Sequence, residues 1–406
     1  MRILIGLMLF VTTLCKAEIV RYEYYGDFPF WESPLQLFKG QNPLTKAQAM
    51  KSVHVQVGFD KLNRIIDIQA RQGKSFKPFY RGFGSLYVYA AHTKVTYGTN
   101  HAKLTFFNGQ GAQIKVNGEV WTMQYSMDER KRFTQLSFLN KDDNIIENRF
   151  GYANYQWQHL DDGSVIETRF NLKGEIKPHR PGFEFERIRL VYDADGHLTL
   201  MQNIDEDGQL VASKSGAAQY RYFYNSIGGF DRWEVYDTKG KPALGPTGTS
   251  GEQYTFDDKG WIKIAFFNQQ GKPGYHASGA VNWHAKYDNY GNMLARWFTD
   301  EDEKNINGRY GFHKVKYVYD KKGMHQVRQE FYSPDDKLIN TIDGVAKVHF
   351  KRDKYGNLLE QKHTDTSGKL VMDTWRKYAV ATYQYDDSGV QTGVDKFDES
   401  GNKLSD

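Results

Sequence analysis

The chain has 406 residues, of which 15% are aromatic and 38 are glycine, and its mean hydropathy is −0.69. This length fits two or three ordinary domains or one long array of repeats. The formal net charge of +5 is nearly balanced over the chain, and no block of five or more like charges occurs, so we expect no nucleic-acid partner.

Residues 1–17 predict a secretory signal peptide. Arg2 is the charged start, and an apolar stretch of about 12 residues ends at Leu14, which is too short for a stable membrane span. We expect cleavage after Ala17 and a periplasmic or secreted bacterial protein without a transmembrane segment. A lipid anchor attached to Cys15 is the alternative. Cys15 is the only cysteine, so the mature chain is expected to lack disulfides and thiolate metal sites.

Residues 18–406 predict one domain of tandem repeats. A run of alternating aromatic and β-branched residues ends at an acidic or amide residue, and a glycine follows three positions later. These acidic or amide residues are Asp193, Asn225, Asp257, Asp288, Asp320, Asp353 and Asp386. Neighbouring members of this series are 31 to 33 residues apart. Self-similarity at a fixed period of this length is the signature of a repeat architecture.

A second turn is expected about 12 residues after the first turn of each unit. Its first residues are Asp205, Asp237, Asn268, Asp365 and Asp398. The copy at Asp300 lacks the glycine, and the copy near Asp336 reads as one residue longer than the others. Each unit is therefore expected to hold two strands and two turns.

The array extends backwards with weaker marks. Asp161 lies 32 residues before Asp193, so we divide the array into degenerate repeats at 18–160 and regular repeats at 161–406, about 11–12 units in all. The segment 42–53 is expected to form a short helix.

The residue types explain why each turn forms. An Asp or Asn side chain accepts hydrogen bonds from backbone N–H groups two residues further on, and the glycine takes the positive φ that closes a hairpin with a bulge. Before Asp320, alternation places Val315, Tyr317 and Tyr319 on one face of a strand.

A single hairpin cannot bury its aromatic face, so neighbouring hairpins must stack. We therefore predict an all-β fold, a tandem β-hairpin repeat array that forms an elongated, twisted or spiralling sheet. A β-propeller with two units per blade is the alternative.

Two stretches, "KYDNYGNML" ending at Leu294 and "RDKYGNLLE" ending at Glu360, resemble the YD repeats of RHS-type proteins. The resemblance implies a non-catalytic, exported β-repeat scaffold, and some members of this group bind carbohydrate. The period near 32 is longer than is typical of YD repeats, and the chain shows neither an RHS core junction motif nor a toxin domain.

The sequence offers little sign of catalytic or metal chemistry. His276 and His284 are eight residues apart and read as packing or surface histidines rather than metal ligands. The turns at Asp193 and Asp205 begin like calcium loops but lack the later bidentate carboxylate that calcium requires, so we interpret them as plain turns. We expect no catalytic residue, no cofactor and no metal.

The aromatic rows are the best candidates for binding. Rings at inward positions are expected to form the core, whereas Phe223 and Trp261 depart from the pattern and are predicted ligand-binding residues. Glu303 and Arg352 are further departures where function should be sought. The predicted function is a binding or scaffold module of the cell envelope with a protein or polysaccharide ligand. The alternative is an envelope enzyme, such as a polysaccharide-active hydrolase, with its site assembled across repeats.

Overall fold

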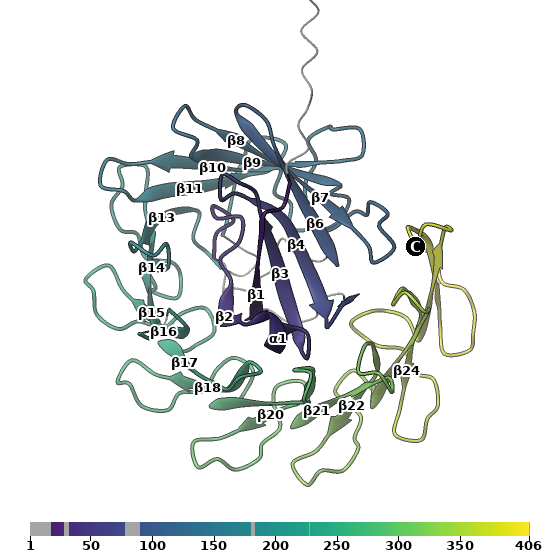
Figure 1. Ribbon diagram of the computed structural model, residues 1–406. Helices are drawn as coiled ribbons and strands as arrows, with labels where there is room; N and C mark the ends of the chain where they lie inside the picture. Colours follow the sequence, from purple (N-terminus) through teal and green to yellow (C-terminus); the bar gives the residue numbers. More distant parts are fainter. Residues whose placement is uncertain (1–17, 28–31, 78–89, 180–182, 227, 406) are drawn as a thin grey trace, which may run out of the picture.

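The computed structural model describes residues 18–27, 32–77, 90–179, 183–226 and 228–405 (Figure 1). The predicted signal peptide, with Cys15, lies outside these residues.

The described residues form a single antiparallel sheet of 26 strands, as expected for an all-β array. Strands that follow each other in the chain pair with each other, except that β1 pairs with both β2 and β3, while the short β5 and β12 extend the pairing of β4 and β11. The first twelve strands are β1 (Arg21–Asp27), β2 (Gln41–Leu44), β3 (Val53–Phe59), β4 (Ile65–Gln72), β5 (Ser75–Phe76), β6 (His92–Tyr97), β7 (His101–Phe107), β8 (Thr122–Met127), β9 (Phe133–Leu139), β10 (Asn154–His159), β11 (Val165–Phe170) and β12 (Ile176–Lys177). The others are β13 (Arg187–Tyr192), β14 (Leu198–Asn203), β15 (Gln219–Tyr224), β16 (Phe230–Tyr236), β17 (Gly251–Phe256), β18 (Trp261–Phe267), β19 (Asn282–Tyr287), β20 (Met293–Thr299), β21 (Lys314–Tyr319), β22 (Gln326–Tyr332), β23 (Lys347–Arg352), β24 (Leu358–Thr364), β25 (Val380–Tyr385) and β26 (Gln391–Phe397).

The sheet is a run of eleven hairpins, from β3–β4 to β25–β26. It is open, because among the described residues β26 pairs with β25 alone. The predicted spiralling array is thereby confirmed, and the alternative of a closed propeller is not what the chain forms.

The first turn of each regular hairpin has the predicted chemistry. Oδ1 of Asp320 accepts hydrogen bonds from the backbone N–H groups of Lys322 and Met324, at 3.0 and 2.8 Å. Gly323 has a φ of +64°, which a residue with a side chain adopts only at a cost. The strand pairing shifts register immediately before this turn, and the same bulge precedes the turn of every hairpin from β13–β14 to β25–β26.

Two expectations about turns were wrong. The copy near Asp336 has the ordinary length, because the turn begins at Ser333 and Asp336 itself takes the glycine position with a φ of +58°. The early turn assigned to Asp161 begins at Leu160, whose N–H bonds the carbonyl of Ser164. In both cases the atypical first residue hid the start of the turn.

Each late unit also contains a third turn, which the two-turn prediction missed. In five units it ends at a glycine with a φ between +79° and +90°, and in the unit that follows them it ends at Lys377, with a φ of +62°. The five glycines are Gly216, Gly248, Gly279, Gly311 and Gly344. Third turns of neighbouring units are joined through the backbone. The N–H of Arg309 donates to the carbonyl of Ser278 at 2.7 Å, and the N–H of Ile342 donates to the carbonyl of Tyr310 at 3.1 Å.

The sheet coils so that β1 to β4 lie inside the ring drawn by the later strands (Figure 1). The helix α1 (Lys46–Ala49) lies there too, within the segment 42–53 predicted to be helical. The coil brings early strand ends against late first turns. Nζ of Lys77 donates to the carbonyl of Gly323 at 2.9 Å, and Nδ2 of Asn108 donates to that of Ser388 at 2.9 Å.

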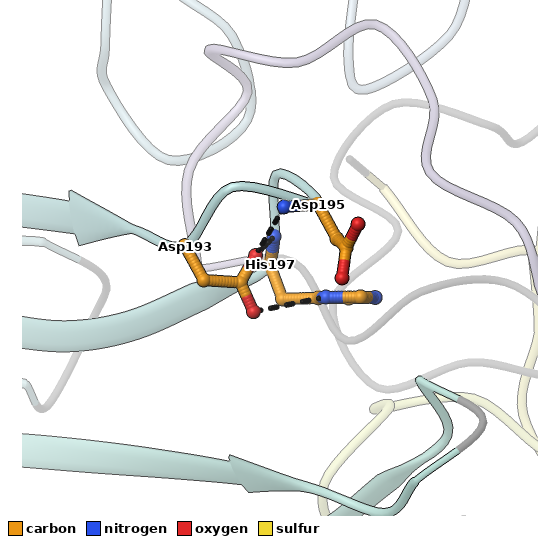
Figure 2. Close-up of side chains that lie close together, drawn as sticks. All are labelled: Asp193, Asp195 and His197. Carbon is orange, nitrogen blue, oxygen red and sulfur yellow. Dashed lines mark hydrogen bonds and ion pairs between the residues drawn. The ribbon is translucent and has the colours of Figure 1, made fainter.

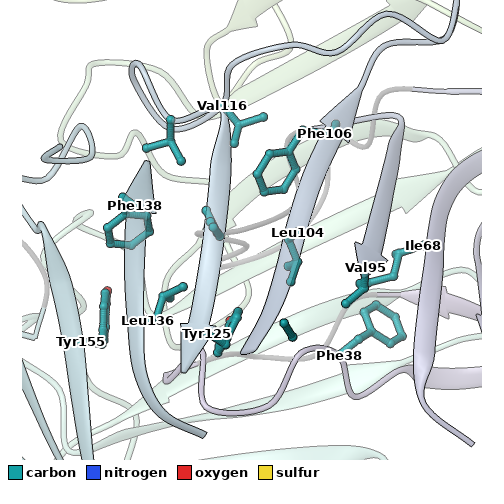
Figure 3. Close-up of a cluster of buried hydrophobic side chains, with 14 of the residues drawn as sticks. Phe38, Ile68, Val95, Leu104, Phe106, Val116, Tyr125, Leu136, Phe138 and Tyr155 are labelled. Atoms are coloured by element: carbon teal, nitrogen blue, oxygen red, sulfur yellow. The ribbon is translucent and has the colours of Figure 1, made fainter. Parts of the chain in front are cut away.

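Residues 32–41 cross the inner face of the early hairpins and complete their core. Phe38 packs in the same cluster as Leu136, Phe138 and Tyr155, all of them buried (Figure 3). The hydroxyl of Tyr125 donates to the carbonyl of Pro34 at 3.0 Å. On the late strands β21 to β26, by contrast, many inward side chains are only half-buried. The aromatic core predicted for every unit is therefore well buried as far as β18 and less completely buried in β21 to β26.

A buried polar cluster fixes residues 32 and 33 against β10 and β11. Glu167 accepts hydrogen bonds from the hydroxyl of Ser33 and from Nε1 of Trp157, the latter at 2.7 Å, and it pairs with Arg169. Arg169 in turn bonds Nδ1 of His179 at 2.6 Å. Because a guanidinium only donates, Nδ1 must be the accepting nitrogen of that ring. All five side chains of the cluster are buried, so we interpret the cluster as holding residues 32–41 against the sheet.

The one α-helix in the described part of the chain falls far short of the length and apolar character that a membrane crossing demands.

Candidate ligand-binding face

The outer face of β18 to β24, opposite the core, gathers basic side chains. In each strand the inward positions hold core residues such as Val315, and the alternate positions point outward. Strand pairing aligns Lys263 with His284, Trp297 with Lys314, and Lys347 with Glu330. The cationic side chains of this face, which we call the basic face, are Lys263, Lys286, Lys314, Lys316, Arg328, Lys347, Lys351 and Lys362.

Four carboxylates partly balance these eight cations. Glu330 pairs with Arg328 at 2.6 Å, and Glu360 pairs with Lys362 at 3.1 Å. Asp336 pairs with both Lys314 and Lys316, and Glu303 pairs with Lys263. The excess is four positive charges. Lys286, Lys347 and Lys351 form no ion pair with any residue that the structure describes.

A pocket of about 370 Å³ opens on the basic face between β19 and β21. Pockets that hold small ligands in proteins begin at about this size. We call it the Trp297 pocket, and its polar or aromatic lining residues are Lys286, Trp297, Asn305, His313, Lys314 and Lys316.

Trp297 is held in place by its neighbours. The His284 ring stacks on it, with ring centroids 5.2 Å apart and planes 12° from parallel. Nε2 of His284 lies 3.0 Å from Oγ1 of Thr299 and 3.2 Å from Oε2 of Glu303. Burial lowers the pKa of His284 despite the nearby Glu303 carboxylate. The pKa of Glu303 is lowered as well, since its bond and charge interaction with Lys263 outweigh the opposing effect of burial. Glu303, which replaces the consensus glycine, therefore supports the side chain that orients Trp297.

His313 forms part of the pocket wall and is 1% exposed. Its Nδ1 lies 3.2 Å from the carbonyl of Ile306, so Nδ1 carries the proton and Nε2 is the accepting nitrogen of the neutral ring. Burial lowers the pKa of His313, in agreement with a neutral ring. Among the described residues Nε2 has no hydrogen-bond partner. A buried polar atom of this kind costs free energy until something bonds it.

The two predicted ligand-binding residues lie away from this pocket. Phe223 is half-buried on the outer face of β15, with the Arg232 guanidinium 3.9 Å from its ring centroid. Trp261 is half-buried at the start of β18 and packs against the core cluster, and its carbonyl accepts from the hydroxyl of Tyr287 at 2.8 Å. Their binding role stays a prediction.

The possible calcium loop at Asp193 has the geometry of a turn. Oδ1 of Asp193 accepts from the backbone N–H groups of Asp195 and His197, and Oδ2 lies 3.2 Å from Nδ1 of His197 (Figure 2). The three side chains offer ligand atoms within 4.8 Å of one another. Lys39, however, donates its ammonium group to the carbonyl of Asp195 and places a cation beside them. We interpret the cluster as turn stabilisation.

The two histidines considered as a ligand pair have separate roles. His276 stacks on Phe266 with ring centroids 4.5 Å apart, whereas His284 stacks on Trp297. Within the described residues, neither histidine belongs to a group of side chains close enough to bind a metal ion.

No protein-family model matches this chain, and no curated protein matches its sequence. Among solved structures, the chain resembles the crystal structure of TcdB2-TccC3-TEV, with 11% identity over 86% of this chain and a TM-score of 0.24. The structure of TcdB2-TccC3 gives 11% identity and a TM-score of 0.23. This chain spans about 20% of the length of those chains. An alternansucrase in complex with isomaltononaose matches 77% of this chain at 14% identity, with a TM-score of 0.15. Likeness at this level assigns neither a family nor an activity nor a partner, so the resemblance to YD repeats stays a prediction.

The sequence carries a signal for the basic face, although its lysines form no continuous run. Lys314 and Lys316 are separated by the buried Val315, and Lys347 and Lys351 are likewise interrupted. Because residues of the two faces alternate along a strand, lysines that share one face are not adjacent in the sequence. A count of lysines at every second position of a predicted strand would have found it.

Proposed function

We propose that this chain is an exported, non-catalytic module that binds an anionic polysaccharide of the cell envelope on its basic face. The observation that carries the proposal is the excess of four positive charges on the outer face of β18 to β24, beside a pocket with an aromatic side chain. A polymer of repeated negative charge suits this surface, because many weak contacts along a row of hairpins add up.

The proposal also uses the regularity of the array. Each hairpin adds two strands, and strands lie about 4.8 Å apart, so equivalent positions recur about every 10 Å along the sheet. Lys314 and Lys347 are such equivalents on β21 and β23. A spacing of this size is comparable with the length of two sugar residues. Flexible, hydrated lysines tolerate small differences between the spacing of the hairpins and the spacing of charges along the polysaccharide.

The test measures retention on immobilised polygalacturonate and on neutral dextran. We expect the wild-type protein to bind polygalacturonate alone, with affinity that falls as salt screens the charges. A triple variant, K347E, K351E and K362E, should lose at least about tenfold in affinity, or 1.4 kcal/mol. The matched control carries K61E, K141E and K214E, three exposed lysines outside the basic face.

The control should bind like the wild type despite its equal change in net charge. Equal losses in the two triple variants would reduce the interaction to overall charge and overturn the assignment to this face. Failure of the wild-type protein to bind any anionic polysaccharide would overturn the proposed function itself.

A further inference from the structure

The Trp297 pocket differs from the rest of the basic face in two respects. It is concave, and it has an aromatic side chain whose orientation is fixed. A charged polymer needs neither of these to be attracted to a row of lysines. Their coincidence points to recognition of one particular unit of the ligand.

Trp297 supplies a flat apolar surface. A sugar ring presents patches of C–H groups on its faces, and such patches pack against aromatic rings as other apolar groups do. His284 occupies one side of the indole and fixes its angle, and Trp297 lines the pocket. Because Thr299 and Glu303 in turn contact His284, the aromatic surface is preorganised before a ligand arrives.

The lysines supply the site for an anion. Lys286, Lys314 and Lys316 all line the pocket. Lys314 and Lys316 share the single carboxylate of Asp336, at 2.9 and 3.5 Å, and Lys286 has no ion pair among the described residues. At least one full positive charge at the pocket is therefore not neutralised by the protein. A carboxylate on the ligand would form charge-assisted hydrogen bonds there.

His313 belongs to the pocket wall, and its Nε2 is shielded from solvent. A free sulfate or phosphate ion has no C–H faces to pack on Trp297. A sugar carries such faces and, when oxidised at its terminal carbon, also the carboxylate that suits the lysines.

We infer that the Trp297 pocket is a subsite for one carboxylated sugar residue, a uronic acid, within the anionic polysaccharide. Trp297 packs on the sugar ring, and Lys286 binds the carboxylate. The inference rests on the proposed function, whose ligand it narrows from any anionic polysaccharide to one that contains uronic acid.

The experiment titrates the protein with three probes while tryptophan fluorescence and heat are recorded. The probes are trigalacturonate, the neutral trisaccharide maltotriose and sodium sulfate. We expect saturable binding of trigalacturonate alone. K286Q should weaken it about tenfold, the loss of one charge-assisted contact. W297A should weaken it by at least about tenfold, as expected when an aromatic stacking platform is removed.

K61Q, an exposed turn lysine, is the matched control and should leave trigalacturonate binding unchanged. Because K286Q alters an exposed side chain without an ion pair, it keeps the test decisive even if W297A disturbs the sheet. Equal binding of maltotriose, or equal competition by sulfate, would overturn the assignment to a uronic acid. So would full trigalacturonate affinity in both K286Q and W297A.

The two proposals fail in different ways. If the wild type binds polygalacturonate and W297A binds it equally well, the polymer function stands and the subsite is overturned. If trigalacturonate binds at Trp297 but the polymer is not retained, the subsite stands and the polymer function is overturned.

Discussion

The early hairpins β8 to β11 and the late hairpins β19 to β24 are made of the same unit but differ on both faces. The outer face of the early hairpins carries uncharged side chains such as Gln124, Gln135, Ser137 and Gln156. The late hairpins carry lysines at the corresponding outward positions. On the inner face, residues 32–41 cover the early hairpins, and the late ones are less completely covered. The same repeat can therefore change its outer-face charge without changing its inner-face packing, because alternate positions of a strand point to opposite faces and vary independently.

The largest expected effect concerns the inner faces. Phe138 on β9 is fully buried, whereas Phe350 on β23 is only half-buried. We expect F138A to lower the free energy of unfolding by about 3–5 kcal/mol, because it leaves a cavity in a closed core. F350A should cost well under half of that, because solvent already reaches the ring. Urea denaturation followed by circular dichroism gives both values, and equal losses would refute the contrast between the two halves.

An intermediate effect is expected where the end of the early strand β5 contacts the late turn at Gly323. The buried ammonium group of Lys77 donates to Oε1 of Gln72 at 2.7 Å, to Oδ1 of Asn292 and to the carbonyl of Gly323. K77M removes these donors and leaves buried acceptors unpaired, at a cost of about 2–4 kcal/mol. Hydrogen exchange should accelerate around 320–324 and stay unchanged around 160–164. The exposed K74M is the control, and acceleration in both regions would mean general destabilisation instead.

The smallest effect concerns two turns that touch, Asn108 in the early part and Asp386 in the late part. Hydrogen bonds from Ser388 and from the Val390 backbone lower the pKa of Asp386 below its ordinary value of 3.8. The ionised carboxylate therefore stabilises the fold above about pH 4. This contribution is lost as the pH falls through the lowered pKa.

The amide of Asn108 accepts equivalent backbone bonds without titrating. D386N should therefore flatten the acid side of the melting-temperature profile slightly, by about 1 °C or less. The measurement is a series of thermal melts between pH 6 and pH 2.5, with S400A as a control in another turn. An unchanged slope in D386N would show that this carboxylate adds nothing to the pH dependence.

The local fold could be predicted from sequence, and the remote contacts could not. Asp320 and Gly323 mark a turn because their side-chain chemistry acts within a few residues. The third turns were missed because their first residues, such as Ser213 and His276, share no chemistry and only the closing glycine recurs.

The candidate site was predictable only in outline. Glu303 was singled out because it breaks the glycine pattern, and it does lie behind Trp297. Which lysines share a face with Trp297 depends on strand register across three hairpins, and a single sequence does not state that register. The buried Nε2 of His313 depends on tertiary packing alone.

The contact between Lys77 and Gly323 has a consequence for the order of folding. The two residues are 246 positions apart in the chain, whereas the strands of each hairpin are separated by a short turn. Closing so long a loop costs more entropy than closing a hairpin, and contacts of large sequence separation form slowly. We expect the hairpins to form first and the coil to close on β1 to β4 last, so that amides near Gly323 gain full protection in a late refolding phase. Simultaneous protection of hairpin and coil amides would contradict this order. If the hairpins do form first, the chain passes through an uncoiled ribbon whose inner aromatic face is transiently open to solvent. At that stage the exposed aromatic face makes association with other unfolded chains most dangerous.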